Sequence, residues 1–344
     1  MVTQKNWLIT GGCGFIGTSL IQQLLKIDRT TNIRVLDNLS VGNEEDLSEV
    51  AKFNKIANPT GAPEGIELFV GDIKNTEDCL NACKGIDIIV HLAANTGVGP
   101  SVEDPEADMQ ANVIGIFNVL QAARANKTNK FIFASSGAPI GELNNPPIHE
   151  ELPAHPVSPY GASKLAGEGY CSAYFHSFGI NTVALRFGNV YGPRSKHKAS
   201  VVAKFIKQAL NGETCEIYGT GQQTRDFIYI LDLVDAIIKS AQADVGGEVF
   251  QIASSKERTV NEIVEIVQQE LKKYGIELKL EYGETRVGDV MRNFSDVSKA
   301  NAMLGWHATT NISDGIAKTI GDFVTECPIN VKNDKIELVN TWNQ

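Results

Sequence analysis

Tyr160 and Lys164 stand four residues apart in the run Tyr160-Gly161-Ala162-Ser163-Lys164, and this spacing puts both side chains on one side of a helix. A free tyrosine has a pKa of about 10, too high for a base at neutral pH unless a nearby cation stabilises the phenolate. Lys164 can supply that cation. Ser136, which closely follows an apolar run at 130–134, could hydrogen-bond the same substrate hydroxyl. These three residues are the candidate catalytic group, although a Tyr-x-x-x-Lys pattern alone is common and usually lies on a surface.

A glycine-rich loop stands near the start of the chain, where Gly12, Gly14 and Gly17 fit the form GxGxxG and Gly11, Gly14 and Gly17 fit GxxGxxG. It follows an apolar strand predicted at 7–10 and opens a helix predicted at 15–27. Such a loop lets the chain turn tightly against a diphosphate, whose charge meets the free amides of the helix. Glycines alone are also typical of a plain tight turn, but this context favours a dinucleotide site.

Asp37 ends the second predicted strand, at 32–36, about twenty residues beyond the glycines. A carboxylate at that place can accept both ribose hydroxyls of NAD and would repel the 2′-phosphate of NADP. No Arg or Lys follows at once, because the next residues are Asn38, Leu39 and Ser40. NAD is therefore favoured, with a turn-forming Asp as the alternative. The positive charge of an oxidised nicotinamide would then help Lys164 to stabilise a Tyr160 phenolate.

The elements that must position these residues alternate between strand and helix. Further strands are predicted at 66–70, 86–90, 130–134 and 181–185, and long helices at 107–126 and 160–178. This rhythm is typical of an α/β fold, a Rossmann doubly wound parallel sheet, in which ligands bind at the carboxyl ends of the strands. We expect an NAD-binding domain at 1–185.

The second half has a less regular rhythm. It predicts a helix at 201–210, a strand at 216–218, a loop at 222–227 and a helix that begins at a capping box, Thr259 to Glu262, and ends at Gly275. We expect a smaller C-terminal α/β substrate lobe at 186–326, parts of which could return to the Rossmann sheet. A loose, polar tail is expected at 327–344.

Composition narrows the classes of function. The 344 residues carry 31 Lys and Arg and 41 Asp and Glu, a net charge of −10, and the basic residues form no stripe, so nucleic acid is not an expected partner. No apolar run reaches membrane-spanning length, and the start of the chain has no signal-peptide pattern. The six cysteines form no CxxC pair, so reduced thiols and no metal site are expected. The sequence predicts a soluble, cytoplasmic protein.

In this order, the motifs resemble the extended short-chain dehydrogenase/reductase family, particularly its NAD-dependent nucleotide-sugar epimerases and dehydratases, and most closely the UDP-hexose 4-epimerases. The resemblance runs from Thr10 to about Gly321. Its motifs are TGGxGFIG, Asp37 to Ser40, Gly71-Asp72-Ile73, His91-Leu92-Ala93-Ala94, Ser135-Ser136, Tyr160xxxLys164, Gly188-Asn189-Val190-Tyr191-Gly192-Pro193 and Arg225-Asp226-Phe227.

The resemblance implies roles for residues that match its motifs. His91 is given a structural role. The implied NAD-site residues are Gly11, Gly14, Phe15, Ile16, Gly17, Asp37, Asn38, Leu39, Ser40, Gly42, Asp72, Ile73, Leu92, Ala93, Ala94, Thr96, Asn112, Tyr160 and Lys164. The implied substrate-binding residues are Ser136, Asn189 near the diphosphate, Ser200, Val201 and Tyr218 near the uracil or ribose, Arg225 and Arg286 as diphosphate partners, and Asp289 and Asn293.

The chain departs from the family pattern at positions that bear on the substrate. Pro139-Ile140-Gly141 replaces Val-Tyr-Gly and removes an aromatic wall, and Asn95-Thr96-Gly97 stands where many hexose epimerases have a Lys. Gly137-Ala138 occupies the place where dehydratases and decarboxylases carry an acidic residue, which favours an epimerase. At Asn293 the family's gating residue is a bulky Tyr that excludes N-acetyl groups, so N-acetylated hexoses are expected to fit.

The expected activity is an isomerase, an NAD-dependent 4-epimerase of UDP-N-acetylglucosamine or UDP-glucose, with UDP-glucuronate as a further candidate. Tyr160 takes the O4 proton while NAD⁺ takes the C4 hydride, and the 4-keto sugar then turns and is reduced on its other face. Alternatives are a nucleotide-sugar 4,6-dehydratase, an NAD-dependent dehydrogenase that releases NADH, and a catalytically silent NAD-binding protein. The two long helices are expected to pair in a homodimer.

Overall fold

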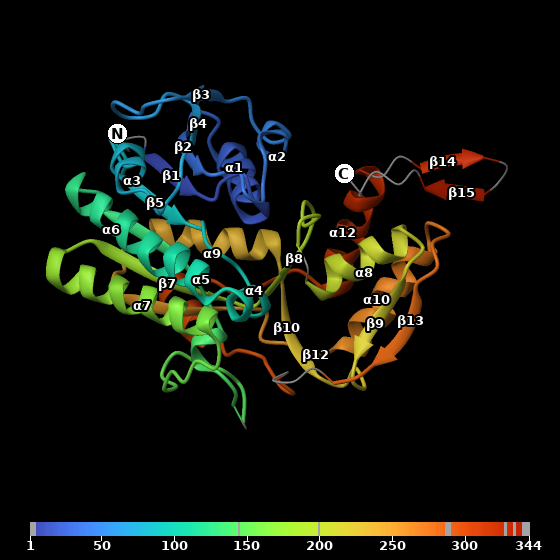
Figure 1. Cartoon of the computed structure of the whole chain (residues 1–344). Coiled ribbons are helices and arrows are strands. Elements are labelled where there is room, and N and C mark those ends of the chain that lie inside the picture. Colours follow the sequence, from blue (N-terminus) through green and yellow to red (C-terminus); the bar gives the residue numbers. More distant parts are fainter. Residues whose placement is uncertain are drawn as a thin grey trace.

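The computed structural model describes residues 5–143, 145–198, 200–285 and 290–326, with the main chain of 329–332 and 335–338. Its centre is an eight-stranded sheet in the order β11-β7-β6-β5-β1-β2-β4-β3, and all neighbouring strands run parallel (Figure 1). The strands are β1 (Asn6–Thr10), β2 (Asn32–Asp37), β3 (Asn54–Ile56), β4 (Ile66–Val70), β5 (Ile88–His91), β6 (Lys130–Ser136), β7 (Asn181–Phe187) and β11 (Glu248–Ile252).

Helices cover both faces of this sheet, because its strands carry apolar residues toward both sides. Leu8 packs into one buried cluster and its neighbour Ile9 into the other, as alternation along a strand requires. On the Ile9 side lie α1 (Phe15–Ile27) and α9 (Ile230–Gln242). On the Leu8 side lie α3 (Thr76–Ala82), α6 (Gly115–Ala125) and α7 (Pro159–Phe178). The predicted doubly wound parallel sheet is confirmed.

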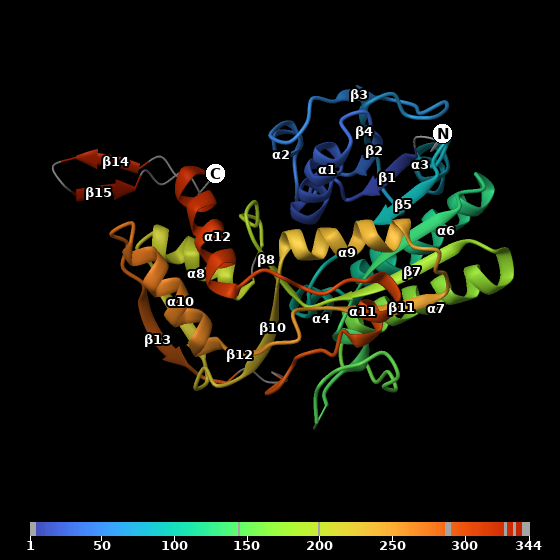
Figure 2. The same ribbon diagram turned by 180° about the vertical axis from the view of Figure 1, so that it is seen from behind.

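A smaller lobe lies beside the sheet (Figures 1 and 2). Strand β11 comes from this half of the sequence yet forms the sheet's edge next to β7, and the domain boundary at 185/186 stays a prediction. The lobe holds a three-stranded sheet of β8 (Asn189–Tyr191), β10 (Thr224–Tyr229) and β12 (Glu257–Thr259), a parallel pair of β9 (Thr214–Tyr218) and β13 (Lys279–Gly283), and the helices α8 (Val201–Leu210), α10 (Val260–Lys272) and α12 (Ile312–Glu326). Helix α11 (Ser298–Leu304) instead packs against β11 and α9 at the large sheet.

Several elements match the expected bounds. Helices α1 and α8 begin and end where the sequence predicts, and α10 begins at the predicted capping box, in which the Thr259 hydroxyl accepts from Glu262 N at 3.1 Å. Shorter elements are α2 (Glu44–Ser48) after β2, α4 (Val98–Glu103) after β5, and the 3₁₀ turn η2 (Ala138–Ile140) after β6.

Three expectations were wrong. The loop predicted at 222–227 is largely strand β10, because its charged Asp226 is buried and accepts hydrogen bonds from Ser254 N, Ser254 Oγ and Ser295 N. The single helix predicted at 107–126 is interrupted: α5 (Pro105–Met109) leads into a π-helical turn, η1 (Gln110–Ile114), and then into α6. The tail expected to be loose contains two paired strands, β14 (Ile329–Lys332) and β15 (Lys335–Leu338).

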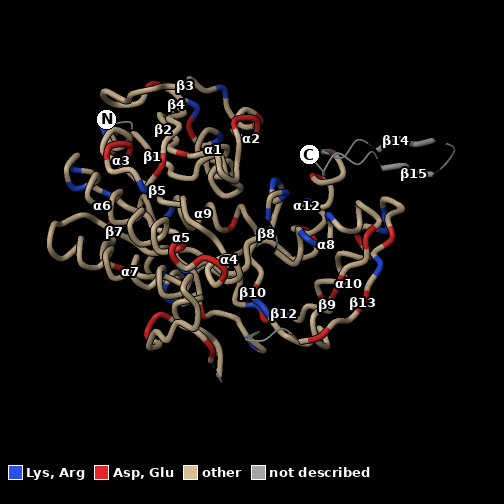
Figure 3. The backbone as a smooth tube through the Cα atoms, viewed as in Figure 1, with Lys and Arg blue, Asp and Glu red and all other residues tan. Residues whose placement is uncertain are grey.

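Acidic and basic residues are interspersed along most of the chain, with acidic residues gathered on α2 and basic residues on the loop before α8 (Figure 3). Within the described residues, no helix combines the length and apolarity that a membrane crossing needs. Cys13, Cys79, Cys83, Cys171 and Cys215 are buried and free. No cluster of three or more potential metal ligands occurs in the described part of the chain.

Candidate active site

The glycine loop forms a cradle in which backbone lies directly against backbone. Gly11 N donates to Leu36 O at 2.8 Å, with Gly11 in the left-handed region at a φ of 69°. A Cβ on Gly17 would lie 2.5 Å from Gly12 Cα, so no side chain fits there. Helix α1 follows with no side-chain cap on its first amides. These free amides, next to backbone that can approach a ligand closely, fit a dinucleotide diphosphate.

Asp37 lies at the carboxyl end of β2, beside the cradle, and is 8% exposed. Its carboxylate accepts from Cys13 N and from Leu39 N, each at 2.9 Å. Burial raises the pKa of Asp37, and these two hydrogen bonds oppose that effect. An ionised carboxylate has about four lone-pair sites, so Asp37 keeps room to accept ribose hydroxyls. Its position is the one that the NAD prediction requires.

The remaining predicted cofactor residues follow the carboxyl ends of neighbouring strands. Asn38 donates to Asp72 at 3.2 Å, which joins the loop after β2 to the loop after β4. These strands are adjacent and parallel, so the loops after them meet at one edge of the sheet. The predicted residues on these loops are Asn38, Leu39, Ser40 and Gly42 after β2, Asp72 and Ile73 after β4, and Leu92, Ala93, Ala94 and Thr96 after β5.

His91, at the end of β5, lies behind the cradle rather than in it. Its Nδ1 is 2.9 Å from the Thr10 hydroxyl, which also accepts from Ala93 N at 3.2 Å. Burial, helped by the charge of Lys164, lowers the pKa of His91 to about 3, so the imidazole is neutral. This neutral side chain joins β1 to β5 and has the surroundings of the structural residue that the sequence predicts.

Asn112 lies in the π-helical turn and connects three segments around the site. Its amide nitrogen donates to Asn95 O and Asp108 Oδ1, each at 2.8 Å, and to Ser163 Oγ at 3.2 Å. Its amide oxygen accepts from Asn95 N at 2.8 Å. The wider turn of η1 presents this side chain to the loop after β5 and to α7, a use of π-helical turns that is frequent at functional sites.

Ser136, Tyr160 and Lys164 meet at the carboxyl end of β6. Lys164 Nζ donates to Ala134 O at 2.9 Å and lies 5.7 Å from the centre of the Tyr160 ring. Burial raises the pKa of Tyr160 to about 12, against a hydrogen bond with Ser136 that lowers it. The structure therefore brings the three predicted residues together, and their chemical roles remain proposals.

The electrostatics of this cluster show what it needs from a cofactor. Burial lowers the pKa of Lys164 to about 8, while the carboxylates of Asp108 and Glu168 act in the opposite direction. Lys164 by itself does not offset the burial of the Tyr160 phenol. A further positive charge near the phenol would favour the phenolate, because opposite charges a few ångströms apart stabilise each other.

Behind the cluster lies a buried ionic network that sequence reasoning missed. Arg186 on β7 donates to both carboxylate oxygens of Glu168 on α7, at 2.8 and 2.7 Å. Ser135, the neighbour of Ser136, donates to Glu168 Oε1 at 2.5 Å. The network thus fixes α7 to β6 and β7 one turn beyond Lys164. The spacing of four residues between Lys164 and Glu168 was the available signal.

A pocket of about 260 Å³ lies between β8, α8, β9, β10 and α10. Five predicted substrate residues line it: Asn189, Ser200, Val201, Tyr218 and Arg225. Sequence reasoning missed three further polar residues that line it: Lys204, Glu216 and Gln223. Lys204 Nζ lies 5.4 Å from the centre of the Tyr218 ring. Lys204 follows Ser200 by one helix turn, and this spacing was the signal that could have found it.

Of the predicted substrate residues, Arg225 lines the pocket, whereas Asn293 lies outside it. Arg225 donates from one guanidinium nitrogen to the carbonyls of Thr224 and Val290, at 2.7 and 2.6 Å. Asn293 is half-buried outside the pocket, on a segment whose Phe294 carbonyl accepts from Ile148 N. Arg286 and Asp289 lie outside the described residues. The roles of these residues in binding a sugar nucleotide stay predictions.

Residues 7–253 match the model of the NAD dependent epimerase/dehydratase family. The chain belongs to this family. A putative UDP-glucose 4-epimerase of Methanocaldococcus jannaschii is 34% identical over 316 residues, which cover 91% of this chain and 96% of that protein.

Solved structures give the same answer. The UDP-N-acetylglucosamine 4-epimerase of Methanobrevibacter ruminantium has a TM-score of 0.84 at 32% identity, covering 94% of this chain and 99% of that one. The UDP-glucose 4-epimerase of Thermus thermophilus, solved with NAD, has a TM-score of 0.80 at 32% identity, covering 92% and 98%. The predicted family, fold class, NAD cofactor and isomerase class are confirmed.

Proposed function

We propose that this family member is a UDP-sugar 4-epimerase that acts on UDP-N-acetylglucosamine and UDP-glucose. The observation that carries the proposal is the meeting of Ser136, Tyr160 and Lys164 beside the glycine cradle, with no acidic side chain in the two positions after Ser136. The cluster would supply a base within reach of a bound sugar hydroxyl. The acidic side chain that is missing after Ser136 is the group that a dehydratase would use.

The cradle and Asp37 would hold NAD, and the bound cofactor would accept a hydride from the sugar and return it. Tyr160 Oη takes the proton from the sugar O4, Ser136 Oγ hydrogen-bonds the same oxygen, and the Lys164 ammonium stabilises the phenolate. The same Tyr160 hydroxyl returns the proton after the sugar has turned. One base therefore serves both halves of the reaction.

The pocket beside β8 and α8 would hold the nucleotide while the sugar turns. Asn189 and Arg225 supply hydrogen-bond donors suited to a diphosphate, and Tyr218 supplies an aromatic face suited to a uracil or ribose. Fixed binding of one end of the substrate leaves the hexose free to rotate about its diphosphate link. This arrangement explains how both faces of a keto sugar reach the same hydride donor.

Two features bear on the sugar. Asn293 takes the place of a bulky Tyr that excludes N-acetyl groups in the family, and the similar M. ruminantium enzyme is named for UDP-N-acetylglucosamine and was solved with UDP-N-acetylmuramic acid. A Cβ added to Gly137 would meet nothing within 4 Å, so an acidic side chain would fit there, yet the chain carries none. The residue at Asn293 favours N-acetylated sugars. The absence of an acidic side chain at Gly137 favours epimerisation over dehydration.

The test incubates the purified protein separately with UDP-N-acetylglucosamine, UDP-glucose and UDP-glucuronate and follows C4 inversion by NMR. Inversion of the first two is expected, and inversion of none would overturn the proposal. A persistent 4-keto-6-deoxy product would identify a dehydratase, and accumulating NADH absorbance a dehydrogenase. A Tyr160→Phe preparation controls for epimerase carried over from the expression host.

A further inference from the structure

Residues 194–198, here named the strap, form a short basic segment between β8 and α8 that is fixed from several sides. Arg194 N donates to Asp322 on α12 at 2.6 Å, and the Lys207 ammonium on α8 donates to the carbonyls of Lys196 and Lys198, each at 2.9 Å. The strap is therefore a built turn. It leads directly to Ser200 and Val201, which line the nucleotide pocket.

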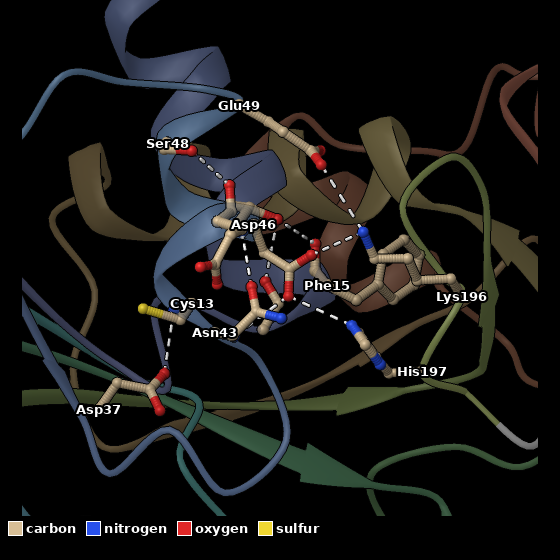
Figure 4. A network of polar contacts seen from close by, with 12 residues as sticks. Cys13, Phe15, Asp37, Asn43, Asp46, Ser48, Glu49, Lys196 and His197 are labelled. Atoms are coloured by element: carbon tan, nitrogen blue, oxygen red, sulfur yellow. Dashed lines mark hydrogen bonds and ion pairs between the residues drawn. The ribbon is translucent and has the colours of Figure 1, made fainter. Parts of the chain in front are cut away.

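The strap is joined to α2, on the cradle side of the molecule, by an ion pair of Lys196 and a polar contact of His197 (Figure 4). Lys196 Nζ lies 2.9 Å from Asp46 Oδ1, and His197 Nε2 lies 3.2 Å from Asp46 Oδ2. The Asp46 side chain is 10% exposed and also accepts from Asn43 N, as part of the capping box of α2. Since little solvent screens this carboxylate, its contacts with the strap are stronger than those of a surface pair.

Helix α2 is in turn connected to the glycine cradle. The loop between Asp37 and α2 lies so close that a Cβ on Gly42 would overlap the carbonyl of Cys13, and Cys13 N donates to Asp37. Asp46 thus lies at the far end of a loop that rests on the cradle. A displacement of Asp46 would therefore reach the backbone of the cradle at Cys13.

The ammonium of Lys198 lies near the start of α1, where the glycine cradle ends. It lies 5.4 Å from the ring centre of Phe15, the first residue of α1. In the described part of the chain no carboxylate forms an ion pair with it, and burial lowers the pKa of Lys198 to about 8. A half-buried ammonium without a counter-ion is costly, and an anion over the uncapped start of α1 would satisfy both the cation and the amides.

We propose that the strap clamps NAD: the Lys198 ammonium binds the cofactor's diphosphate over the first turn of α1, while Lys196 and His197 fasten the strap to Asp46. The inference rests on the proposed function, in which NAD is regenerated at every turnover and has no need to leave. The clamp makes dissociation of NAD slow. The strap would then contact the diphosphate of the cofactor through Lys198, and it leads to Ser200 and Val201, which line the nucleotide pocket.

The test measures the dissociation rate of NAD by exchange against excess isotopically labelled NAD, without any sugar present. Lys198→Met is expected to release NAD about tenfold faster, because it removes a charged hydrogen-bond donor to the diphosphate. Asp46→Asn keeps an oxygen for Asn43 N but loses the ionic contacts, and a several-fold faster release is expected. The double variant should fall short of the product of the two effects, because the residues act through one strap.

Matched variants separate this clamp from general effects of charge. Lys55→Met removes an exposed lysine that pairs with Glu44 on α2, and its release rate should equal that of the unaltered protein. Lys198→Arg keeps the cation and should keep slow release. Thermal unfolding of the NAD-free Lys198→Met protein should occur at a temperature no lower than that of the unaltered chain, because the change removes a half-buried, unpaired charge, and this would exclude misfolding as the cause.

A Lys198→Met protein that releases NAD within twofold of the unaltered rate would overturn the proposal. If Lys198→Met does not fold, Lys198→Gln and Asp46→Asn provide the same comparison. The exchange requires no epimerisation, so a protein that inverts no UDP-sugar but loses NAD faster in these variants would refute the proposed function and leave the clamp supported.

Discussion

The cofactor cradle and the nucleotide pocket are built in different ways. The cradle comes from one stretch, Gly11 to Gly42, in which backbone contacts backbone and a single Cβ would collide. The pocket comes from side chains on five elements between β8 and α10. A site made of backbone contacts admits few substitutions, whereas a site made of side chains can change its ligand one residue at a time. This contrast predicts which positions set cofactor binding and which set the affinity for a sugar nucleotide.

The largest effect is expected where the two regions meet. Tyr160→Phe removes the proposed base without changing the ring's packing, so turnover should fall by about a hundredfold to ten-thousandfold while the NAD content of the protein stays unchanged. Initial rates by NMR and NAD content after denaturation provide the measurement. Turnover that persists would remove Tyr160 from its proposed role, and loss of NAD would mean that the phenol belongs to the cradle.

Glu168→Gln should cost about 3–5 kcal/mol in the free energy of unfolding, because it leaves the buried Arg186 guanidinium without its carboxylate partner. The matched variant is Asp235→Asn on α9, whose pair with Lys239 is solvent-exposed and should be worth less than about 1 kcal/mol. Urea unfolding of both proteins checks the difference. Equal losses in the free energy of unfolding would show that the buried network of Glu168 and Arg186 does not stabilise the fold more than a surface ion pair does.

Gly17→Ala should weaken NAD binding by about a hundredfold, since its Cβ would lie 2.5 Å from Gly12 Cα and 2.6 Å from Gly11 O, and overpacking costs up to about 3 kcal/mol. Gly169→Ala on α7 is the control, because a Cβ there meets nothing within 4 Å. That change should stabilise the helix by about 0.5–1 kcal/mol and leave NAD binding intact. Isothermal titration with NAD distinguishes the two glycines, and similar affinities would refute the backbone account.

His91 predicts a pH dependence for the cofactor half. Its pKa of about 3 in the folded protein is below its ordinary value, so the unfolded chain takes up the proton first and stability falls as the pH drops from about 6.5 toward 3. Between pH 7 and pH 5 this residue should account for about 2 kcal/mol of that loss. In His91→Gln the loss should be smaller by that amount, as urea unfolding of both proteins at pH 7 and pH 5 would measure. An unchanged profile in His91→Gln would contradict the buried, neutral imidazole.

Contiguous features of the site could be predicted from the sequence. The glycine loop, α1 and Asp37 follow one another within the first strand-helix-strand unit, so their spacing alone fixes their geometry. Ser136 could be placed because the carboxyl ends of parallel strands share one edge. Tyr160 and Lys164 could be placed because one helix turn joins them.

Features that join distant segments could not be predicted in this way. Strand β10 was expected as a loop, and only the fold shows that Ser254 and Ser295 satisfy the buried carboxylate of Asp226. The π-helical turn accompanies a hydrogen bond from Asn112 to Asn95, across 17 positions of the sequence. The contact of Lys198 with Phe15 has no local signal, because topology alone brings the two residues together. The five pocket residues that the sequence analysis named came from the family resemblance and not from spacing.

The smallest effect is expected in the pocket, at Asn189. Its side chain is exposed at the start of β8 and donates to Asp226 O at 3.2 Å, so it can exchange that bond for a substrate oxygen at little cost. Asn189→Ala should raise KM for the UDP-sugar about fivefold, the worth of one net hydrogen bond, with kcat and NAD content unchanged. Asn211→Ala, at an exposed amide after α8 that pairs with Glu213, should change none of the three. If Asn189→Ala instead lowered NAD content, the pocket and the cradle would share residues, and the division between a backbone-built and a side-chain-built site would fail.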